Sequence, residues 1–156
     1  FWTFFIVVGG SGATMGLVIC YLRSRSAHLR SIGRLSVVPS IFNINEPVIF
    51  GTPIVMNPVF FIPFLLAPMV NAVLAWAAMK LDLIGRVISV VPWTAPAPVG
   101  AAWALGWDYR AAILVVLLAL VSAVIYFPFF KVYEKQLLAQ EKEEAQRIEE
   151  ENQQVA

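Results

Sequence analysis

The chain of 156 residues is 60% hydrophobic and only 13% charged, whereas ordinary soluble domains carry about 25% charged residues. Its mean hydropathy is +0.77, which excludes a soluble enzyme. The formal net charge is +1, and no basic face is large enough to make nucleic acid a partner. The single cysteine, Cys20, lies in an apolar run, where it is predicted to be a buried packing residue.

The charges divide the chain into two parts. Residues 1–130 hold seven Lys and Arg against three Asp and Glu, whereas residues 131–156 hold four against seven. We therefore expect a membrane domain over 1–130 and a charged tail over 131–156. The opening residues, FWTFF, have no initiating Met and no basic segment before the apolar run, so they are not a signal peptide. We expect the chain to be part of a longer protein.

Three apolar runs, 1–22, 59–79 and 111–130, come close to the roughly 20 residues that a helix needs to cross a bilayer. The sequence thus predicts an all-α integral membrane protein with about three spanning helices. The first run contains GGSGATMG, in which Gly12 and Gly16 have the spacing of small residues at helix contacts. A local break of this helix and a backbone site that touches substrate are the other interpretations.

Residues 23–35, RSRSAHLRSIGRL, have two faces on a helical wheel. Arg30 and Arg34 fall on one face with Arg23, and Leu29 and Ile32 fall on the other. This pattern predicts an amphipathic helix at the membrane interface. Because the segment carries four arginines and no acidic residue, we expect it on the cytoplasmic side.

Two segments contain too many prolines for a straight spanning helix. Residues 36–58 contain four, and one of them, Pro47, directly follows Glu46, which predicts a helix break or a helix end at that glutamate. Residues 87–109 contain three prolines and three tryptophans. Unwound backbone at membrane depth is tolerated only where protein or a wet cavity surrounds it. We therefore predict two re-entrant segments, with Trp103 and Trp107 in the aromatic belt at the interface and Trp93 within irregular backbone.

The end of the last apolar run indicates the orientation. Lys131 and Lys135 follow it, so we expect the C-terminus in the cytoplasm. The tail is rich in strong helix formers, and Glu143 and Arg147 have the spacing of a helical ion pair. It lacks a sustained apolar stripe, which predicts a solvated helical extension; a docking role is the alternative.

The carboxylate of Glu46 is costly in this setting, since a charge at the centre of a membrane helix costs about 2.5–3.5 kcal/mol on insertion scales. Such residues mark substrate or ion pathways. Asn43 and Asn45 lie beside it, and together these groups can receive several hydroxyls. No further ligand completes a metal site, and no cofactor is implied. We predict a sugar site buried in a cavity, with Trp93 as a stacking platform. The structural alternative is a neutral Glu46, or one paired with Arg34 or Arg86.

Three motifs resemble one family in the same order. FNINEPVIFGTPIVMNP, with GGSGAT before it and VPWTAP after it, is similar to the membrane component, enzyme IIC, of phosphoenolpyruvate-dependent sugar phosphotransferase systems. The resemblance is to the lactose, cellobiose and diacetylchitobiose branch, whose members are much longer. The chain corresponds to their C-terminal third.

The resemblance implies a permease of the bacterial cytoplasmic membrane that binds and translocates a β-linked disaccharide. A phosphorylated cytoplasmic B component carries the phosphoryl donor residue and phosphorylates the sugar, so the permease is itself only a subunit of the phosphotransferase. The resemblance further implies that Glu46 contacts the hydroxyl to be phosphorylated, that Trp93 covers the sugar ring, and that the full-length protein is a homodimer.

Two other functions remain open at the level of sequence. An ion-coupled secondary transporter would also hold a carboxylate at broken helices near the midplane, with Glu46 as the proton or cation carrier. An inactive truncated permease would insert in the membrane and bind nothing. The fate of the sugar, phosphorylated or unchanged on arrival, separates the first of these from a phosphotransferase component.

Overall fold

A computed structural model describes the backbone of residues 1–155 and the side chains of residues 1–54 and 56–150. Within that range every regular element is helical. In chain order they are η1 (Trp2–Ile6), α1 (Met15–Leu22), α2 (Ala27–Ile41), α3 (Glu46–Gly51), η2 (Ile54–Met56), α4 (Pro58–Lys80), α5 (Ala97–Ala104) and α6 (Tyr109–Val155). The prediction of an all-α chain is confirmed for the described residues.

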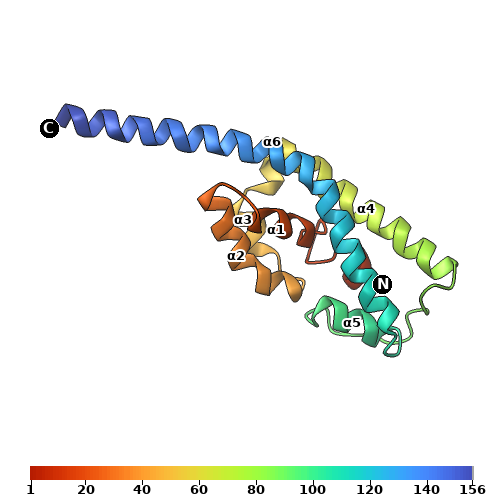
Figure 1. Cartoon of the computed structure of the whole chain (residues 1–156). Coiled ribbons are helices and arrows are strands. Elements are labelled where there is room, and N and C mark those ends of the chain that lie inside the picture. Colours follow the sequence, from red (N-terminus) through yellow and green to blue (C-terminus); the bar gives the residue numbers. More distant parts are fainter. Residues whose placement is uncertain (156) are drawn as a thin grey trace.

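Two helices are long and apolar enough to cross a membrane, α4 and α6, as predicted for 59–79 and 111–130. They run antiparallel and side by side (Figure 1). Asn57 caps α4, because its side-chain oxygen accepts a hydrogen bond from the Val59 amide at 3.0 Å, and Pro58 occupies the first turn, where its missing N–H costs nothing. In the most apolar 18-residue stretch of each helix, only 28% of the residues of α4 and 33% of those of α6 are buried. Both helices therefore present apolar faces outward.

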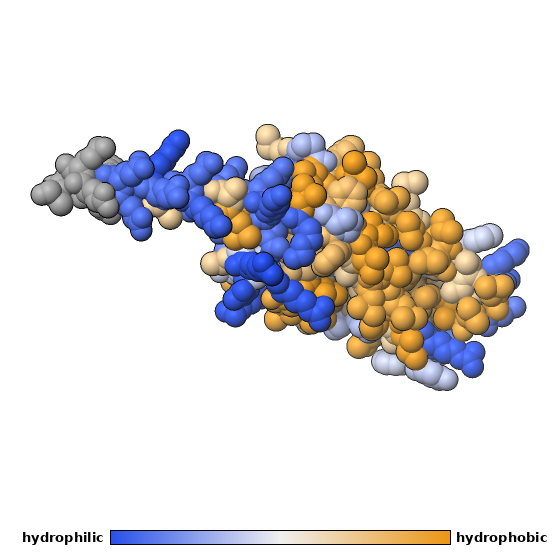
Figure 2. Space-filling model, turned by 45° about the horizontal axis from the view of Figure 1, so that its top comes forward, coloured by the Kyte–Doolittle hydropathy of each residue, from blue (hydrophilic) through white to orange (hydrophobic). Residues whose placement is uncertain are grey.

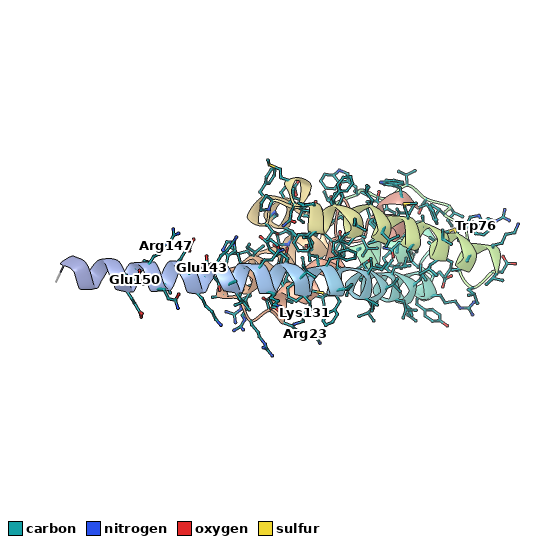
Figure 3. All side chains as sticks on the ribbon, turned by 90° about the horizontal axis from the view of Figure 1, so that it is seen from above. Arg23, Trp76, Lys131, Glu143, Arg147 and Glu150 are labelled. Atoms are coloured by element: carbon teal, nitrogen blue, oxygen red, sulfur yellow. The ribbon has the colours of Figure 1, made fainter. Side chains whose placement is uncertain are left out.

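The tail continues α6 without a break. The division at residue 131 is therefore one of composition and not of secondary structure. The helix leaves the body beyond the other elements (Figure 1), and the space-filling view shows the hydrophilic tail joined to a largely apolar body (Figure 2). Glu143, Arg147 and Glu150 lie along this extension (Figure 3). The predicted pair of Glu143 and Arg147 does not form, since the only ion pair among the described side chains is elsewhere.

The first apolar run is not one spanning helix, so the prediction of a continuous helix over 1–22 is wrong and the local break is right. A single π-helical turn, η1, is separated from α1 by the unwound residues 7–14. Gly9, Gly10 and Gly12 have φ angles of +79°, +102° and +81°. These left-handed conformations suit glycine, which has no Cβ, and they end the helix inside an apolar sequence.

The basic segment forms most of α2, which begins at Ala27 because the Ser26 side chain accepts a hydrogen bond from the Leu29 amide at 3.4 Å. Leu29 and Ile32 are buried while Arg30 and Arg34 are exposed, so the two predicted faces are confirmed. The helix extends further than 23–35 predicts, through Pro39 to Ile41. Pro39 cannot donate to the carbonyl four residues earlier, and α2 ends two residues after it, at Ile41.

The two proline-rich segments are broken as predicted. Between α2 and α4 the chain forms only α3 and the 3₁₀ turn η2, and between α4 and α6 it forms only α5. Glu46 is the first residue of α3, directly after a turn, which confirms the expected break. Trp103 and Trp107 are exposed and stack, with ring centroids 6.3 Å apart and planes inclined by 10°.

Small residues allow α1 to approach α6 closely. A Cβ built on Gly16 would overlap the backbone of Ser122 and Ala123, which confirms helix contact for this glycine. Gly12 instead lies in the unwound loop, facing the ring of Phe64. Cys20 is buried nearby. Around this contact two clusters of buried residues form the core, one near α5 and the other between α1, α2 and α6.

We expect Gly16→Ala to destabilise the fold, because the added methyl group meets backbone that cannot rotate away. Overpacking of this kind costs about 1–3 kcal/mol. The matched control is Gly85→Ala, since the nearest atom to a Cβ there is a side-chain oxygen of Asp108 at 3.9 Å. Thermal unfolding of the two variants in detergent measures the difference. Equal melting temperatures would contradict close packing at Gly16.

Candidate functional site

Asn43 joins the three sequence motifs. Its amide nitrogen donates to the backbone carbonyls of Trp93, at 3.1 Å, and Ala95, at 3.4 Å. Its amide oxygen accepts a hydrogen bond from the Gly9 amide at 3.2 Å. Asn43 has a φ of +60°, a left-handed conformation in which asparagine is several-fold enriched. One buried side chain thus links the NEP turn to the glycine loop and to the tryptophan segment.

Asn45 adds a second link to the glycine loop. Its amide nitrogen donates to the carbonyl of Ser11 at 2.7 Å and to the hydroxyl of Thr14 at 3.0 Å. The Thr14 hydroxyl in turn donates to the carbonyl of Gly9 at 2.9 Å. The contact is tight, because a Cβ on Gly10 would overlap the side chain of Asn45. Glycine is therefore required at these positions of GGSGAT because a neighbouring side chain occupies the space that a Cβ would need.

The spanning helices donate hydrogen bonds to two further backbone carbonyls at the break. From α6, the Tyr126 hydroxyl donates to the carbonyl of Gly12 at 2.7 Å. From α4, the amide nitrogen of Asn71 donates to the carbonyl of Ile6 at 3.3 Å and to the Ser122 hydroxyl at 3.0 Å. All these donors are buried. They replace the helical hydrogen bonds that the glycines remove, as unwound backbone at membrane depth requires.

Glu46 lies next to this network and outside it. It is exposed, whereas the sequence predicts a carboxylate buried in a cavity. Glu46 is the first residue of the short helix α3, and its neighbour Asn45 is turned to the glycine loop. The single ion pair among the described side chains joins Lys131 to Glu134. Glu46 therefore pairs with neither Arg34 nor Arg86, and its carboxylate is available to a ligand.

The amides differ from Glu46 in this respect. Asn43 and Asn45 are buried, and the N–H groups of both are donated to the protein itself. The backbone carbonyl of Trp93 accepts the hydrogen bond from Asn43, and the residue is 58% exposed. The three segments are thus tied together by the asparagines, while the carboxylate of Glu46 and the indole of Trp93 remain open. Among the described side chains no cluster of three metal-binding residues occurs.

Several residues of this network carry little signal in the sequence. Thr14 lies inside the GGSGAT motif, so its proximity to the site was suggested by the motif alone. Tyr126 and Asn71 lie in the spanning runs, where only their polar groups distinguish them from neighbours. A buried hydroxyl or amide in an apolar helix needs a partner, which is the one clue that each contacts another segment.

Comparison with known proteins identifies the family. The family model for the phosphotransferase system EIIC component matches residues 1–68. The lactose-specific EIICB component of Streptococcus mutans serotype c is 44% identical over 144 residues, 90% of this chain and 25% of that protein. The lichenan permease IIC component of Bacillus subtilis is 41% identical over 143 residues, 90% of this chain and 32% of that protein.

A solved structure agrees in fold. The crystal structure of the transporter ChbC, the IIC component of the N,N'-diacetylchitobiose-specific phosphotransferase system, superposes with a TM-score of 0.87 at 43% identity. The match covers 91% of this chain and 33% of that one. The chain belongs to the EIIC family of the phosphotransferase system. It spans about a quarter to a third of the length of these relatives, which fits the expectation of a C-terminal part, and the predicted resemblance to this branch is confirmed.

We expect Asn43→Asp to loosen the tryptophan segment of this EIIC chain. Aspartate keeps an acceptor for the Gly9 amide but cannot donate to the carbonyls of Trp93 and Ala95, and an unsatisfied buried group costs about 1–3 kcal/mol. In the full-length permease the variant should unfold at lower temperature. It should also be cleaved faster by trypsin after Arg86, in the irregular segment beyond α4.

The matched control for this variant is Asn57→Asp. Asn57 caps α4 through its side-chain oxygen alone, and aspartate caps helices equally well. Equal melting temperatures and equal cleavage rates for Asn43→Asp and Asn57→Asp would contradict the linking role of the Asn43 amide.

Proposed function

We propose that this chain forms the sugar-binding part of a permease that binds and translocates a β-linked disaccharide for phosphorylation by a cytoplasmic B component. The observation that carries the proposal is the bridge made by Asn43. Its hydrogen bonds hold the turn that precedes Glu46 against the segment that carries Trp93. A carboxylate and an indole, both exposed, thereby project from segments that are fixed to each other.

The substrate class rests on the relatives. Their names specify lactose in Streptococcus mutans, cellobiose in Lactococcus lactis and N,N'-diacetylchitobiose in the solved structure. All three names denote β-linked disaccharides, and identity to this chain is similar in each case, at 44%, 43% and 43%. The proposal is therefore a disaccharide of the cellobiose, diacetylchitobiose or lactose type.

Each predicted site residue has a role in this proposal. Glu46 accepts a hydrogen bond from the hydroxyl that receives phosphate and takes its proton during transfer, as a general base does. Trp93 covers the C–H face of the sugar ring, since stacking on an indole leaves the sugar hydroxyls free at the ring edge. Asn43 and Asn45, predicted as sugar ligands, act chiefly by holding these two residues, because their amide N–H groups are already engaged.

The proposed partners are the disaccharide, the phosphorylated B component, the lipid bilayer and, in the full-length protein, a second copy in a homodimer. The phosphoryl donor residue belongs to the B component in this scheme. Positioning and charge stabilisation then account for most of the catalysis, as is general for phosphoryl transfer.

For the topology we propose that α4 and α6 cross the bacterial cytoplasmic membrane and that 36–58 and 87–109 are re-entrant. The basic helix α2 then lies at the cytoplasmic surface and the C-terminus is cytoplasmic. Lys131 and Lys135, which follow 20 uncharged residues at 111–130, support this orientation. Trp76, which is exposed near the opposite end of α4 from the tail (Figure 3), suits the other interface.

We expect Glu46→Gln in a full-length permease, with its B component supplied, to retain measurable sugar binding and to lose most sugar phosphorylation. Glutamine can accept a hydrogen bond but cannot take a proton, and loss of a general base typically costs 10²–10⁴-fold in rate. Glu46→Ala should lose both binding and phosphorylation. The control is Asp82→Asn, which neutralises another exposed carboxylate, in the turn after α4.

Two results would count against this assignment. Normal phosphorylation by Glu46→Gln would show that the carboxylate is not a base. Accumulation of unmodified sugar against a gradient would instead support the ion-coupled secondary transporter, with Glu46 as its proton or cation carrier.

A further inference from the structure

Two cavities meet at Lys131, where α6 leaves the apolar body. The first, of about 370 Å³, lies between α1 and α6 and is lined mainly by apolar side chains, including Ile19, Val124 and Phe127, with Arg23 and Lys131 also in its lining. The second, of about 540 Å³, is lined by Arg25, Lys131, Glu134, Lys135 and Lys142, with Leu138 and Ala139. Lys131 lines both, so the two cavities adjoin at this residue, and together they are called the groove below. Figure 3 shows Arg23 and Lys131 together beside α6.

The charge of this groove is strongly positive. Five cations line it and one acid does, so its lining carries a net charge of 5 − 1 = +4. The acid, Glu134, is already satisfied: the Ser24 hydroxyl and the Arg25 amide each donate to it at 2.7 Å, and Lys131 at 3.0 Å. Glu141, next along α6, accepts a hydrogen bond from the Ser26 hydroxyl. Within the described side chains the other four cations of the groove form no ion pair.

The groove also has a defined orientation toward the membrane. Lys131 is the first charged residue after the apolar run 111–130, and its ammonium lies 5.7 Å and 5.5 Å from the ring centroids of Phe127 and Phe130. The apolar cavity therefore lies on the hydrocarbon side of Lys131 and the basic cavity on the water side. Basic pockets beside membrane helices on the cytoplasmic side are typical sites for anionic lipid head groups.

We propose that this groove binds one anionic phospholipid, with an acyl chain in the apolar cavity and the phosphate among Arg23, Arg25 and Lys135. A protein partner with an acidic surface would use the basic cavity only, because the apolar one lies at hydrocarbon depth. The complementarity of both cavities to one amphipathic anion favours the lipid. Such a lipid would fasten the turn between α1 and α2 to α6, beside the hydrogen bonds of Glu134.

The test uses the full-length permease purified in neutral detergent, with phosphatidylglycerol and phosphatidylcholine compared by native mass spectrometry. We expect phosphatidylglycerol to be retained preferentially. Arg23→Gln and Lys135→Gln should each weaken that retention about fivefold, the effect of one basic residue near an anionic surface. The matched control is Arg34→Gln, an exposed arginine of α2 that lines neither cavity. Lys131 is left unchanged because of its pairing with Glu134.

The apolar cavity is tested separately. Val124→Phe should fill it and weaken phosphatidylglycerol retention, whereas Val73→Phe, at an exposed valine of α4 outside the groove, should not. Equal retention of the two lipids, or equal effects of Arg23→Gln and Arg34→Gln, would overturn the proposal. Full competition by soluble glycerol phosphate would show that the groove binds an anion and not a lipid. Unchanged retention of phosphatidylglycerol by Val124→Phe would lead to the same conclusion.

Discussion

The structure depends on how the unwound backbone of residues 7–14 is satisfied. Three glycines in left-handed conformations end the helix within an apolar run, and an unsatisfied peptide group in hydrocarbon costs several kcal/mol. Asn43 and Asn45, from the turn before α3, and Tyr126, from α6, supply hydrogen bonds to this backbone. The loop can form only when these segments are in position, so the break and the tertiary fold require each other.

The same hydrogen bonds have a consequence for function. The Gly9 amide needs an acceptor, and the side-chain oxygen of Asn43 supplies it. The side-chain nitrogen of the same asparagine donates to the backbone carbonyl of Trp93. Glu46 follows three residues later at the start of α3. The polar residues that stabilise the break are thus also those that orient the exposed groups. The three short motifs, far apart in the sequence, therefore lie in contact in the structure.

Much of the fold follows from the sequence, because hydropathy and charge decide it locally. The lengths of α4 and α6, the buried and exposed faces of α2, and the helix break at Glu46 depend on nearby residues alone. The continuous helix predicted over 1–22 is wrong because hydropathy carries no information about backbone conformation. The run that contains GGSGAT is apolar enough to cross a membrane, but its glycines adopt positive φ angles that a right-handed helix does not contain. The spacing of Gly12 and Gly16 predicted a helix contact for both residues. The structure has this contact at Gly16, whereas Gly12 lies in the unwound loop.

The sequence suggests Asn43, Asn45, Glu46 and Trp93 as candidates for the site, but it does not indicate how they are arranged. Asparagine side chains beside a glutamate indicate polar recognition, but which amide faces a ligand and which faces backbone depends on segments 34 and 50 residues away. Tyr126 is a similar case, since its partner at Gly12 lies 114 residues away. Local composition carries no information about such pairs. Whether Glu46 is buried also depends on residues distant in the sequence, and in this structure it is exposed.

The central claim, that Asn43 acts on sugar through the position of Trp93, is tested most directly by a double-mutant cycle in the full-length permease. Sugar dissociation constants would be measured for Asn43→Asp, Trp93→Ala and the double variant, with Trp107→Ala replacing Trp93→Ala in a parallel cycle. If Asn43 works by positioning, Asn43→Asp should weaken binding several-fold alone and hardly at all once the Trp93 side chain is removed, while its effect should persist in the Trp107→Ala background. Additive effects of Asn43→Asp and Trp93→Ala, as for independent sites, would contradict the account.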